Sequence, residues 1–239
     1  MKKVKDDRGY SQIYKESAAV PIRMERRCDY MIGQMPKLSA KHTILEIGCG
    51  TGEVAFMMAK KIPAMVVGTD LCEPFIELAN QTYQLPNLSY SILDFNDDAQ
   101  IQALAVQKFD YIVGNGILHH LYHHLDNTLE RFKKLLNHGG KIIFIEPNIY
   151  NPYIAAIFQI PFLRKWASLE PDEMAFSPTF IKEKLVAHGY QNIDIEFKDF
   201  LLPNTPKVLI QPIITIGDVV EKIPVLKAVS QSIFINASI

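Results

Sequence analysis

From residue 43 onwards, short apolar runs of strand length alternate with segments that have the spacing of helices. This alternation is typical of a parallel sheet covered by helices, and runs that are apolar on both faces fit strands buried on both sides. The pattern predicts an α/β fold. The five runs are Thr43–Ile47, Ala64–Asp70, Leu88–Leu93, Phe109–Gly114 and Lys141–Glu146.

The segments between these runs supply the helices. The clearest helix is predicted over 121–136, where apolar residues recur at helical spacing opposite a charged face. Weaker helical segments are Glu53–Lys60, Pro74–Tyr83, Asp97–Ala105 and, before the first run, Tyr10–Gln34, which is interrupted by Pro21.

Beyond the fifth run, the segment 150–172 is rich in aromatic residues and proline and leaves the alternation. Ser177 and Pro178 then offer an N-cap and a first-turn proline for a helix through Ala187. Two further strands are predicted at Asn192–Phe200 and Ser232–Ala237.

The composition excludes several classes of protein. Of 239 residues, 48% are hydrophobic, and the formal net charge is −1, so the chain is neither disordered nor a general nucleic-acid binder. Cys28, Cys49 and Cys72 are far apart, which argues against disulfides and structural zinc. No signal peptide and no membrane-spanning run is visible, and we expect a cytoplasmic, soluble protein.

A glycine-rich loop follows the first strand directly and leads into a helix. Gly48, Gly50 and Gly52 let the backbone turn tightly and approach a ligand, and the helix start presents N–H groups to an anion. Asp70 ends the second strand, 20 residues after Gly50, where a carboxylate can accept from both hydroxyls of a ribose. These features predict a nucleoside-containing cofactor at the carboxyl edge of the sheet.

The loop alone leaves the cofactor open. From Gly50 it reads Gly-x-Gly-x-x-Ala, a loose dinucleotide fingerprint that allows an NAD-dependent oxidoreductase. From Glu46 it reads Glu-x-Gly-x-Gly-x-Gly, and here the chain resembles the class I S-adenosylmethionine-dependent methyltransferases. A protein that binds this cofactor without catalysis is a further alternative.

Landmarks in the expected order carry the resemblance from about Thr43 to Asn148. After the loop come Asp70, the pair Asp94-Phe95 behind the third strand, and 109–113 leading into 115–121. The turn at 135–141 is similar to the family's leucine–proline–glycine–glycine turn, with His138 where proline is usual. The resemblance implies a Rossmann-like, mostly parallel sheet of seven strands with helices on both faces and the last strand antiparallel.

The resemblance also implies roles around S-adenosylmethionine, whose product is S-adenosylhomocysteine. Asp70 would hold the ribose hydroxyls, with Leu71 against the adenine, while Asp94 would accept from the adenine amino group and Phe95 would flank the ring. Glu46 would orient the glycine loop. The residues expected around the methionine part are Gly48, Cys49, Gly50, Gly52, Asn115 and Gly116.

An oxygen or carbon acceptor has to lose a proton, and histidine is the usual base near neutral pH. His119 and His120 lie just beyond the fourth strand, and His120 matches the family's single histidine best. Two further histidines, His123 and His124, give i,i+4 pairs with them, but no third ligand with clear geometry follows except Asp126. We therefore expect no metal.

We expect a small-molecule acceptor and no nucleic acid, because the run after the fourth strand does not resemble the Asn/Asp-Pro-Pro-Tyr/Phe element of amino-methylating enzymes. The aromatic insert after Tyr150 and the apolar segment 207–229 indicate that this acceptor is apolar or lipid-like. We expect an N-terminal helical lid (1–40), a cofactor core (41–149), an acceptor insert (150–176) and a C-terminal part (177–239). The apolar segment 207–229 is a dimer face, a pocket roof or a peripheral membrane contact in a monomer or homodimer. Candidate acceptor-binding residues are Tyr10, Tyr14, Tyr150, Tyr153 and Trp166.

Overall fold

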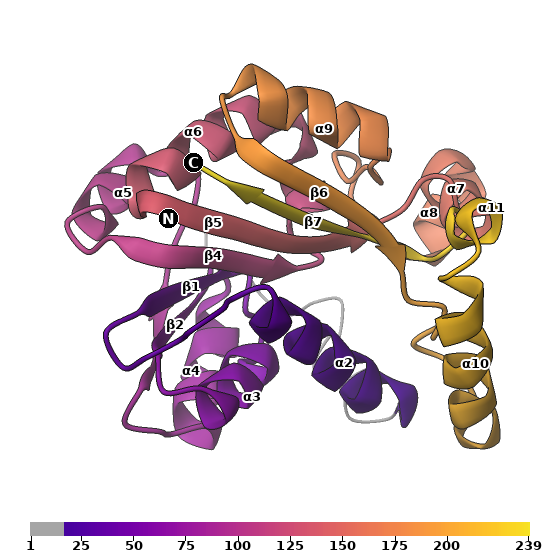
Figure 1. The fold of residues 1–239 in the computed structure, drawn as a ribbon, viewed down its shortest axis with the longest axis horizontal. Helices are drawn as coiled ribbons and strands as arrows, with labels where there is room; N and C mark the ends of the chain where they lie inside the picture. Colours follow the sequence, from indigo (N-terminus) through magenta and orange to yellow (C-terminus); the bar gives the residue numbers. More distant parts are fainter. Residues whose placement is uncertain (1–16) are drawn as a thin grey trace.

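The computed structural model describes residues 17–239, in which seven strands form one sheet of order β3-β2-β1-β4-β5-β7-β6 (Figure 1). Neighbours from β3 to β5 are parallel, and β7 is antiparallel to both β5 and β6. The mostly parallel sheet with an antiparallel last strand is therefore confirmed. The strands are β1 Thr43–Ile47, β2 Met65–Asp70, β3 Leu88–Ile92, β4 Phe109–Asn115, β5 Leu136–Pro147, β6 Gln191–Lys198 and β7 Ser232–Ser238.

Three helices cover each face of the sheet, on opposite sides in Figure 1. Successive strand residues point to opposite faces, so Ile44 packs into one apolar cluster and Leu45 into the other. One face carries α2 (Ala19–Gly33), α3 (Glu53–Lys61) and α4 (Glu73–Thr82). The other face carries α5 (Asp98–Leu104), α6 (Leu125–Leu135) and α9 (Pro178–Ala187).

Local sequence signals explain where several helices begin. Ser177 caps α9 by accepting from the N–H of Phe180, as its position before Pro178 predicts. Pro21 lies in the first turn of α2, where an N–H would have no intrahelical partner. The part of the expected helix Tyr10–Gln34 from Ala19 to Gly33 is thus present as α2, and residues 10–16 lie outside the described part of the chain.

Two connections differ from the expectation. The helix predicted over 121–136 is divided into a 3-10 helix, η1 (Leu118–His124), and α6. The turn expected at 135–141 is the irregular start of β5, with Gly139 in the left-handed region and a register shift opposite Phe109 and Tyr111. The apolar spacing predicted the buried face of this region but not the tighter winding of its first turns.

Four helices lie beyond the sheet at the carboxyl end of its parallel strands, on the right of Figure 1. Asn151 caps the first of them by accepting from the N–H groups of Tyr153 and Ile154. No helix within 17–239 is long and apolar enough to cross a membrane. The four helices are α7 (Pro152–Gln159), α8 (Pro161–Trp166), α10 (Lys207–Val220) and α11 (Pro224–Lys227).

Candidate active site

The strand order reverses between β1 and β4, so their carboxyl ends diverge into a crevice, the usual ligand site of open α/β sheets. The glycine loop leaves β1 at this point. Gly48, Gly50 and Gly52 all have positive φ. A Cβ on Gly48 would lie 2.6 Å from the Ile117 side chain, whereas Gly50 faces open space. The loop thus packs closely against the end of β4 and stays open where a ligand would bind.

Asp70 closes the other side of this loop. Its carboxylate accepts from the N–H of Gly50 at 2.9 Å and from the N–H of Cys72 at 2.8 Å. Burial raises the pKa of Asp70 above its ordinary value, while these two donors oppose the rise. Leu71 beside it is exposed. A nucleoside can therefore meet both a carboxylate and an apolar surface at the end of β2.

The other expected cofactor residues have unequal surroundings. Asp94 accepts from the N–H of Asn96 in the turn after β3. Phe95 is buried in the core with its ring 5.2 Å from that of Phe132, so packing accounts for it. The Cys49 thiol is buried, which raises its pKa well above the ordinary value and keeps it neutral. The cofactor roles of these residues stay predictions.

At the end of β4, Asn115 accepts a hydrogen bond of 2.7 Å from Arg27 on α2. Gly116 has a φ of 71° and donates to Ile145 O on β5. The contact between Gly48 and Ile117 brings this segment against the glycine loop. Asn115 and Gly116 consequently lie between the glycine loop and α2.

Glu146, at the end of β5, organises the start of η1. Its buried carboxylate accepts from the N–H groups of Ile117, Leu118 and His119. The same carboxylate also lies 2.9 Å from Nδ1 of the His119 ring. A carboxylate is an acceptor, so Nδ1 carries the proton and His119 Nε2 keeps the free lone pair. Sequence reasoning did not select Glu146, although its position at a strand's carboxyl end was a usable signal.

His120 belongs to a second pair. Its Nδ1 lies 3.2 Å from the buried Glu173, and its ring centroid is 4.2 Å from that of His119. A positive charge on His120 would lower the pKa of Asp70. Ligand atoms of His119, His120 and Glu173 lie within 4.8 Å of one another and could reach a metal ion. Each imidazole already has a carboxylate partner without an ion, and the expectation of no metal stays a prediction.

The spacing of the four histidines does not bring them together as i,i+4 pairs. They lie on η1, a 3-10 helix with three residues per turn, so residues four apart do not share a face. The metal arrangement considered from that spacing is therefore not formed. His119 and His120 meet carboxylates from distant segments instead.

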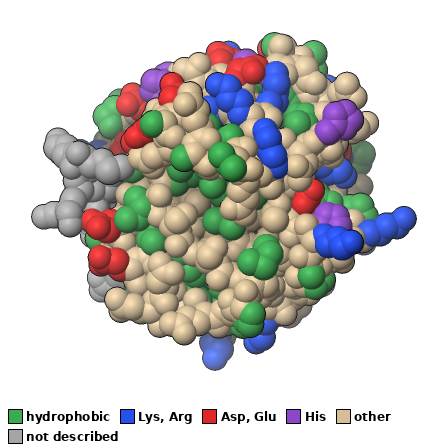
Figure 2. Space-filling view, turned by 90° about the vertical axis from the view of Figure 1, so that its left-hand side faces the viewer, with side chains coloured by type: hydrophobic (Ala, Val, Ile, Leu, Met, Phe, Trp, Pro, Cys, Tyr) green, Lys and Arg blue, Asp and Glu red, His purple; other side chains and the backbone are tan. Residues whose placement is uncertain are grey.

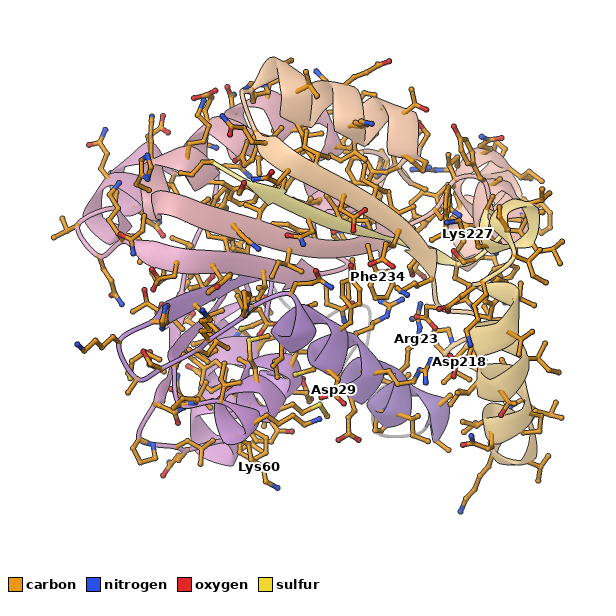
Figure 3. The ribbon with its side chains drawn as sticks, in the orientation of Figure 1. Arg23, Asp29, Lys60, Asp218, Lys227 and Phe234 are labelled. Atoms are coloured by element: carbon orange, nitrogen blue, oxygen red, sulfur yellow. The ribbon has the colours of Figure 1, made fainter. Side chains whose placement is uncertain are left out.

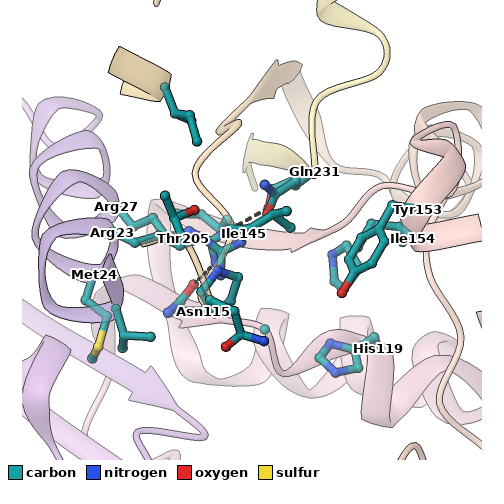
Figure 4. Close-up of a pocket in the computed structure, with 18 of the residues that line it drawn as sticks. Arg23, Met24, Arg27, Asn115, His119, Ile145, Tyr153, Ile154, Thr205 and Gln231 are labelled. Atoms are coloured by element: carbon teal, nitrogen blue, oxygen red, sulfur yellow. Dashed lines mark hydrogen bonds between the residues drawn. The ribbon is translucent and has the colours of Figure 1, made fainter. Parts of the chain in front are cut away.

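A cavity of about 550 Å³ adjoins this site (Figure 4). One end is polar: Arg23 and Arg27 share the carboxylate of Asp199, and Arg23 also donates to Gln231. His119 and Tyr153 lie across the cavity from that end. The apolar lining residues include Val20, Met24, Ile145, Ile154, Leu202 and Ile213.

The expected acceptor residues do not all meet at the cavity. Tyr153 lines it, whereas Tyr150 stacks on Phe197 and Trp166 is exposed on α8. Tyr10 and Tyr14 lie outside the described residues. The arginines of α2, Asp199 and Gln231 were not anticipated from the sequence, because only the fold brings these four distant positions together.

Comparison with known proteins shows a similarity to methyltransferases. Residues 45–142 match the family model described as a methyltransferase domain. Over 167 residues, 65% of this chain, 29% are identical to lovastatin diketide synthase lovF of Aspergillus terreus, of which the match covers 7%. The hybrid synthetase poxE of Penicillium oxalicum is 32% identical over 112 residues, 43% of this chain and 3% of that protein. The chain spans less than a tenth of the length of these relatives.

Solved structures share the fold over nearly the whole chain. A SAM-dependent methyltransferase from Archaeoglobus fulgidus superposes with a TM-score of 0.66 at 18% identity, covering 96% of this chain and 99% of that one. The CurJ carbon methyltransferase gives 0.61 at 22% identity, with coverages of 95% and 56%. Residues 45–142 are thus similar to a methyltransferase domain, and the chain has the fold of S-adenosylmethionine-dependent methyltransferases. These similarities favour S-adenosylmethionine over the dinucleotide that the glycine loop alone allowed.

Proposed function

We propose that this methyltransferase transfers the methyl group to an acidic carbon of a small, largely apolar acceptor bound in the cavity. The observation that carries the proposal is the 2.9 Å contact between His119 Nδ1 and buried Glu146, at the cavity wall. A carbon acid has to lose a proton in order to attack, and an imidazole held by a carboxylate is a suitable base.

Each residue then has a defined task. His119 Nε2 takes the proton from the acceptor carbon, and Glu146 stabilises the positive charge that the ring acquires. The apolar cavity wall holds the acceptor beside the end of β4. S-adenosylmethionine supplies the electrophilic methyl group together with its own leaving group. The open space at Gly50 and the carboxylate of Asp70 fit this cofactor.

The geometry favours His119 over His120 as the base. His119 lines the cavity, whereas His120 faces Glu173 and acts electrostatically on Asp70. We therefore assign His120 to the cofactor side. This assignment replaces the sequence-based preference for His120, which rested on position in the motif alone.

The relatives support carbon over oxygen as the methylated atom. The curated relatives are synthases of polyketides, and one structural neighbour is named a carbon methyltransferase. The near-neutral net charge supports a small molecule rather than a nucleic acid.

Proton exchange tests the base separately from methyl transfer. The enzyme, saturated with S-adenosylhomocysteine, is incubated in heavy water with a β-oxoacyl thioester, and loss of the acidic C–H signal is followed by NMR. We expect His119→Gln to slow exchange by about 10²–10⁴-fold. His124→Gln, an exposed histidine of the same 3-10 helix, is the matched control and should leave the rate unchanged.

The methylated atom is tested with labelled S-adenosylmethionine and two acceptors, the same thioester and an alkylphenol. Methylation of the thioester at carbon supports the proposal. Methylation of the phenol oxygen alone, or a His119→Gln variant with wild-type exchange, would overturn it.

A further inference from the structure

Six large apolar side chains of the described residues are more than 60% exposed, and all of them except Val106 lie on the helices at one end of the molecule. Phe162 and Trp166 on α8 are 70% and 68% exposed, and Val208 on α10 and Val225 on α11 are 81% and 79% exposed. These helices lie together beyond the carboxyl edge of the sheet (Figure 1). Figure 2 shows the opposite end, where apolar side chains are scattered among polar ones. We call the surface formed by Phe162, Trp166, Val208, Ile216, Val219 and Val225 the apolar end face.

Hydrogen bonds join the two helical pairs that form this face. Asn151, the cap of α7, donates to Val229 O, and Asn148 donates to Ala228 O just after α11. The α7–α8 pair and α11 are therefore held to the same strand ends. The apolar end face is a feature of the folded chain and not of a detached loop.

The exposed side of α10 is unusual for a helix facing water. The inner side of α10 packs against the rest of the protein. Gly217 lies against Phe200, and Asp218 points toward α2 and pairs with Arg26 (Figure 3). The half-exposed Asp218 is paired with Arg26, and of the fully exposed residues of α10 only Lys207 is charged. These exposed residues are Lys207, Val208, Leu209, Gln211, Pro212, Thr215, Ile216 and Val219. A surface helix would normally present charged residues there.

The helices α7, α8, α10 and α11 together carry four basic residues and one acid, Asp218, which pairs with Arg26. Glu170 and Asp172 are exposed in the loop after α8. In the part of the chain that the structure describes, α8 and α11 contain no acidic residue, and the acids after α8 lie in the loop 167–174. Four lysines without a salt bridge to the described residues lie on these helices or between them, and Lys227 is labelled in Figure 3. They are Lys165, Lys207, Lys222 and Lys227.

The same elements also form the wall of the acceptor cavity. Tyr153 and Ile154 on α7, Ile213 on α10 and the loop 202–206 line it. An acceptor carried by a surface that contacts the apolar end face would therefore lie next to the cavity.

We propose that the apolar end face docks on the surface of an anionic lipid bilayer. Phe162, Trp166 and the exposed valines enter the headgroup region, where aromatic side chains are favoured, and the lysines meet lipid phosphates. Apolar burial and charge attraction then act together, as stable peripheral binding requires. The segment 207–229, which the sequence left between three roles, contributes α10 and α11 to this face.

Trp166 is the only tryptophan of the chain and reports directly on the face. The full chain is titrated with vesicles of phosphatidylcholine, or of phosphatidylcholine with about one-third phosphatidylglycerol. We expect a blue shift of the Trp166 emission and co-flotation with the anionic vesicles, both weakened at about 1 M salt. A Trp166 spectrum unchanged by anionic vesicles would overturn the proposal.

Two matched double variants locate the contact. Val208→Ser with Val225→Ser removes two valines of the face and should lower the vesicle partition coefficient about tenfold. Val106→Ser with Val186→Ser removes two exposed valines elsewhere and should leave it unchanged. Equal binding by both variants contradicts the proposal.

Sedimentation velocity distinguishes a second copy of the chain as the occupant. A wild-type dimer that ignores vesicles, together with a monomeric Val208→Ser and Val225→Ser variant, would assign the face to dimerisation and overturn membrane docking. S-adenosylhomocysteine binding by every variant confirms that it is folded. Because no readout requires methyl transfer, failure of the proposed carbon chemistry would leave this test unaffected.

Discussion

Glu46, the acidic residue that opens the glycine motif, is buried in β1 beneath the loop. Among the described residues, its Oε2 has no hydrogen-bond partner. Burial, followed by the nearby charge of Glu53, raises the pKa of Glu46 to about 8. The side chain is therefore a neutral acid at the pH of most measurements, which fits a residue that supports the loop from below.

The raised pKa of Glu46 makes stability depend on pH. The folded protein holds the proton to a higher pH than the unfolded chain does, so this contribution is present below the ordinary pKa and is lost as pH rises toward 8. Glu46→Gln cannot lose that proton. We expect its stability relative to wild type to increase between pH 5 and 8 by up to about 1.4 kcal/mol per pH unit. Urea unfolding of both proteins at several pH values measures this difference in the free energy of unfolding. A difference that does not change with pH would contradict the raised pKa of Glu46.

Asp70 is expected to supply binding energy for the ribose. Asp70→Asn removes the charged acceptor, and we expect S-adenosylhomocysteine to bind about 1–3 kcal/mol more weakly, which is roughly 5-fold to 150-fold in Kd. Titration calorimetry measures the change. Asparagine can accept only one of the two N–H bonds that Asp70 accepts from Gly50 and Cys72, so thermal unfolding of the unliganded variant is compared as well.

The control for Asp70 is Asp172→Asn, which removes an exposed carboxylate in the loop after α8. It should leave the affinity for S-adenosylhomocysteine unchanged. A wild-type Kd in Asp70→Asn would show that the ribose is held elsewhere.

At the scale of elements, the strands of the core were predictable because each combines an apolar run with a turn or helix signal. β1 was predicted at its observed bounds, and β2, β3 and β4 within a residue at either end. The 3-10 winding of η1 was not predictable, because it depends on Glu146. This residue lies on β5, 27 to 29 residues further along the chain, and accepts from three N–H groups at the start of η1. Residues placed by strand ends, such as His119 and Glu146, can be found from the sequence, but the pairing of His119 with Glu146 and of His120 with Glu173 cannot.

The α2 helix is tied to the end of β6 by a buried ion cluster. Arg27 and Asp199 are 8% and 9% exposed, with 2.6 Å between Arg27 Nη2 and the carboxylate. Burial alone would raise the pKa of Asp199, but the charges of Arg23 and Arg27 outweigh it and hold the pKa below its ordinary value. Asp199 therefore stabilises the fold above its ordinary pKa, and that contribution is lost as pH falls.

Asp199→Asn would leave two arginines without their shared carboxylate. We expect the free energy of unfolding to fall by about 3–5 kcal/mol at neutral pH, with a smaller loss in acid. Asp218→Asn is the matched control, because its pair with Arg26 is about half exposed and contributes about 0–1 kcal/mol. Urea denaturation of both variants decides the point, and equal losses would mean that the buried cluster does not hold α2 in place.

At the scale of the whole molecule, the carboxyl edge of the sheet carries two neighbouring parts, which we call the cofactor half and the acceptor half. In the function proposed above, the glycine loop and Asp70 bind the cofactor and the cavity binds the acceptor. Asn115, Gly116 and His119 line that cavity. The sequence predicted the cofactor half because its motifs are local. It could not place the acceptor half, since the cavity wall combines α2, α7, the loop 202–206 and α10, which are joined only by folding.

Because the cofactor half is built from β1, β2 and β4 together, a bound cofactor should stabilise the whole fold and not one loop. At a concentration of 100 times its Kd, S-adenosylhomocysteine should add about 2.7 kcal/mol, which for a chain of this size raises Tm by about 5–10 °C. NADH at the same concentration should produce no shift, because the methyltransferase site is matched to a nucleoside with a methionine arm rather than to a second nucleotide. Differential scanning calorimetry measures both shifts. A shift with NADH alone would mean that the Gly-x-Gly-x-x-Ala interpretation of the loop was the correct one, and His119, His120 and Asp94 would then lose the roles proposed for them.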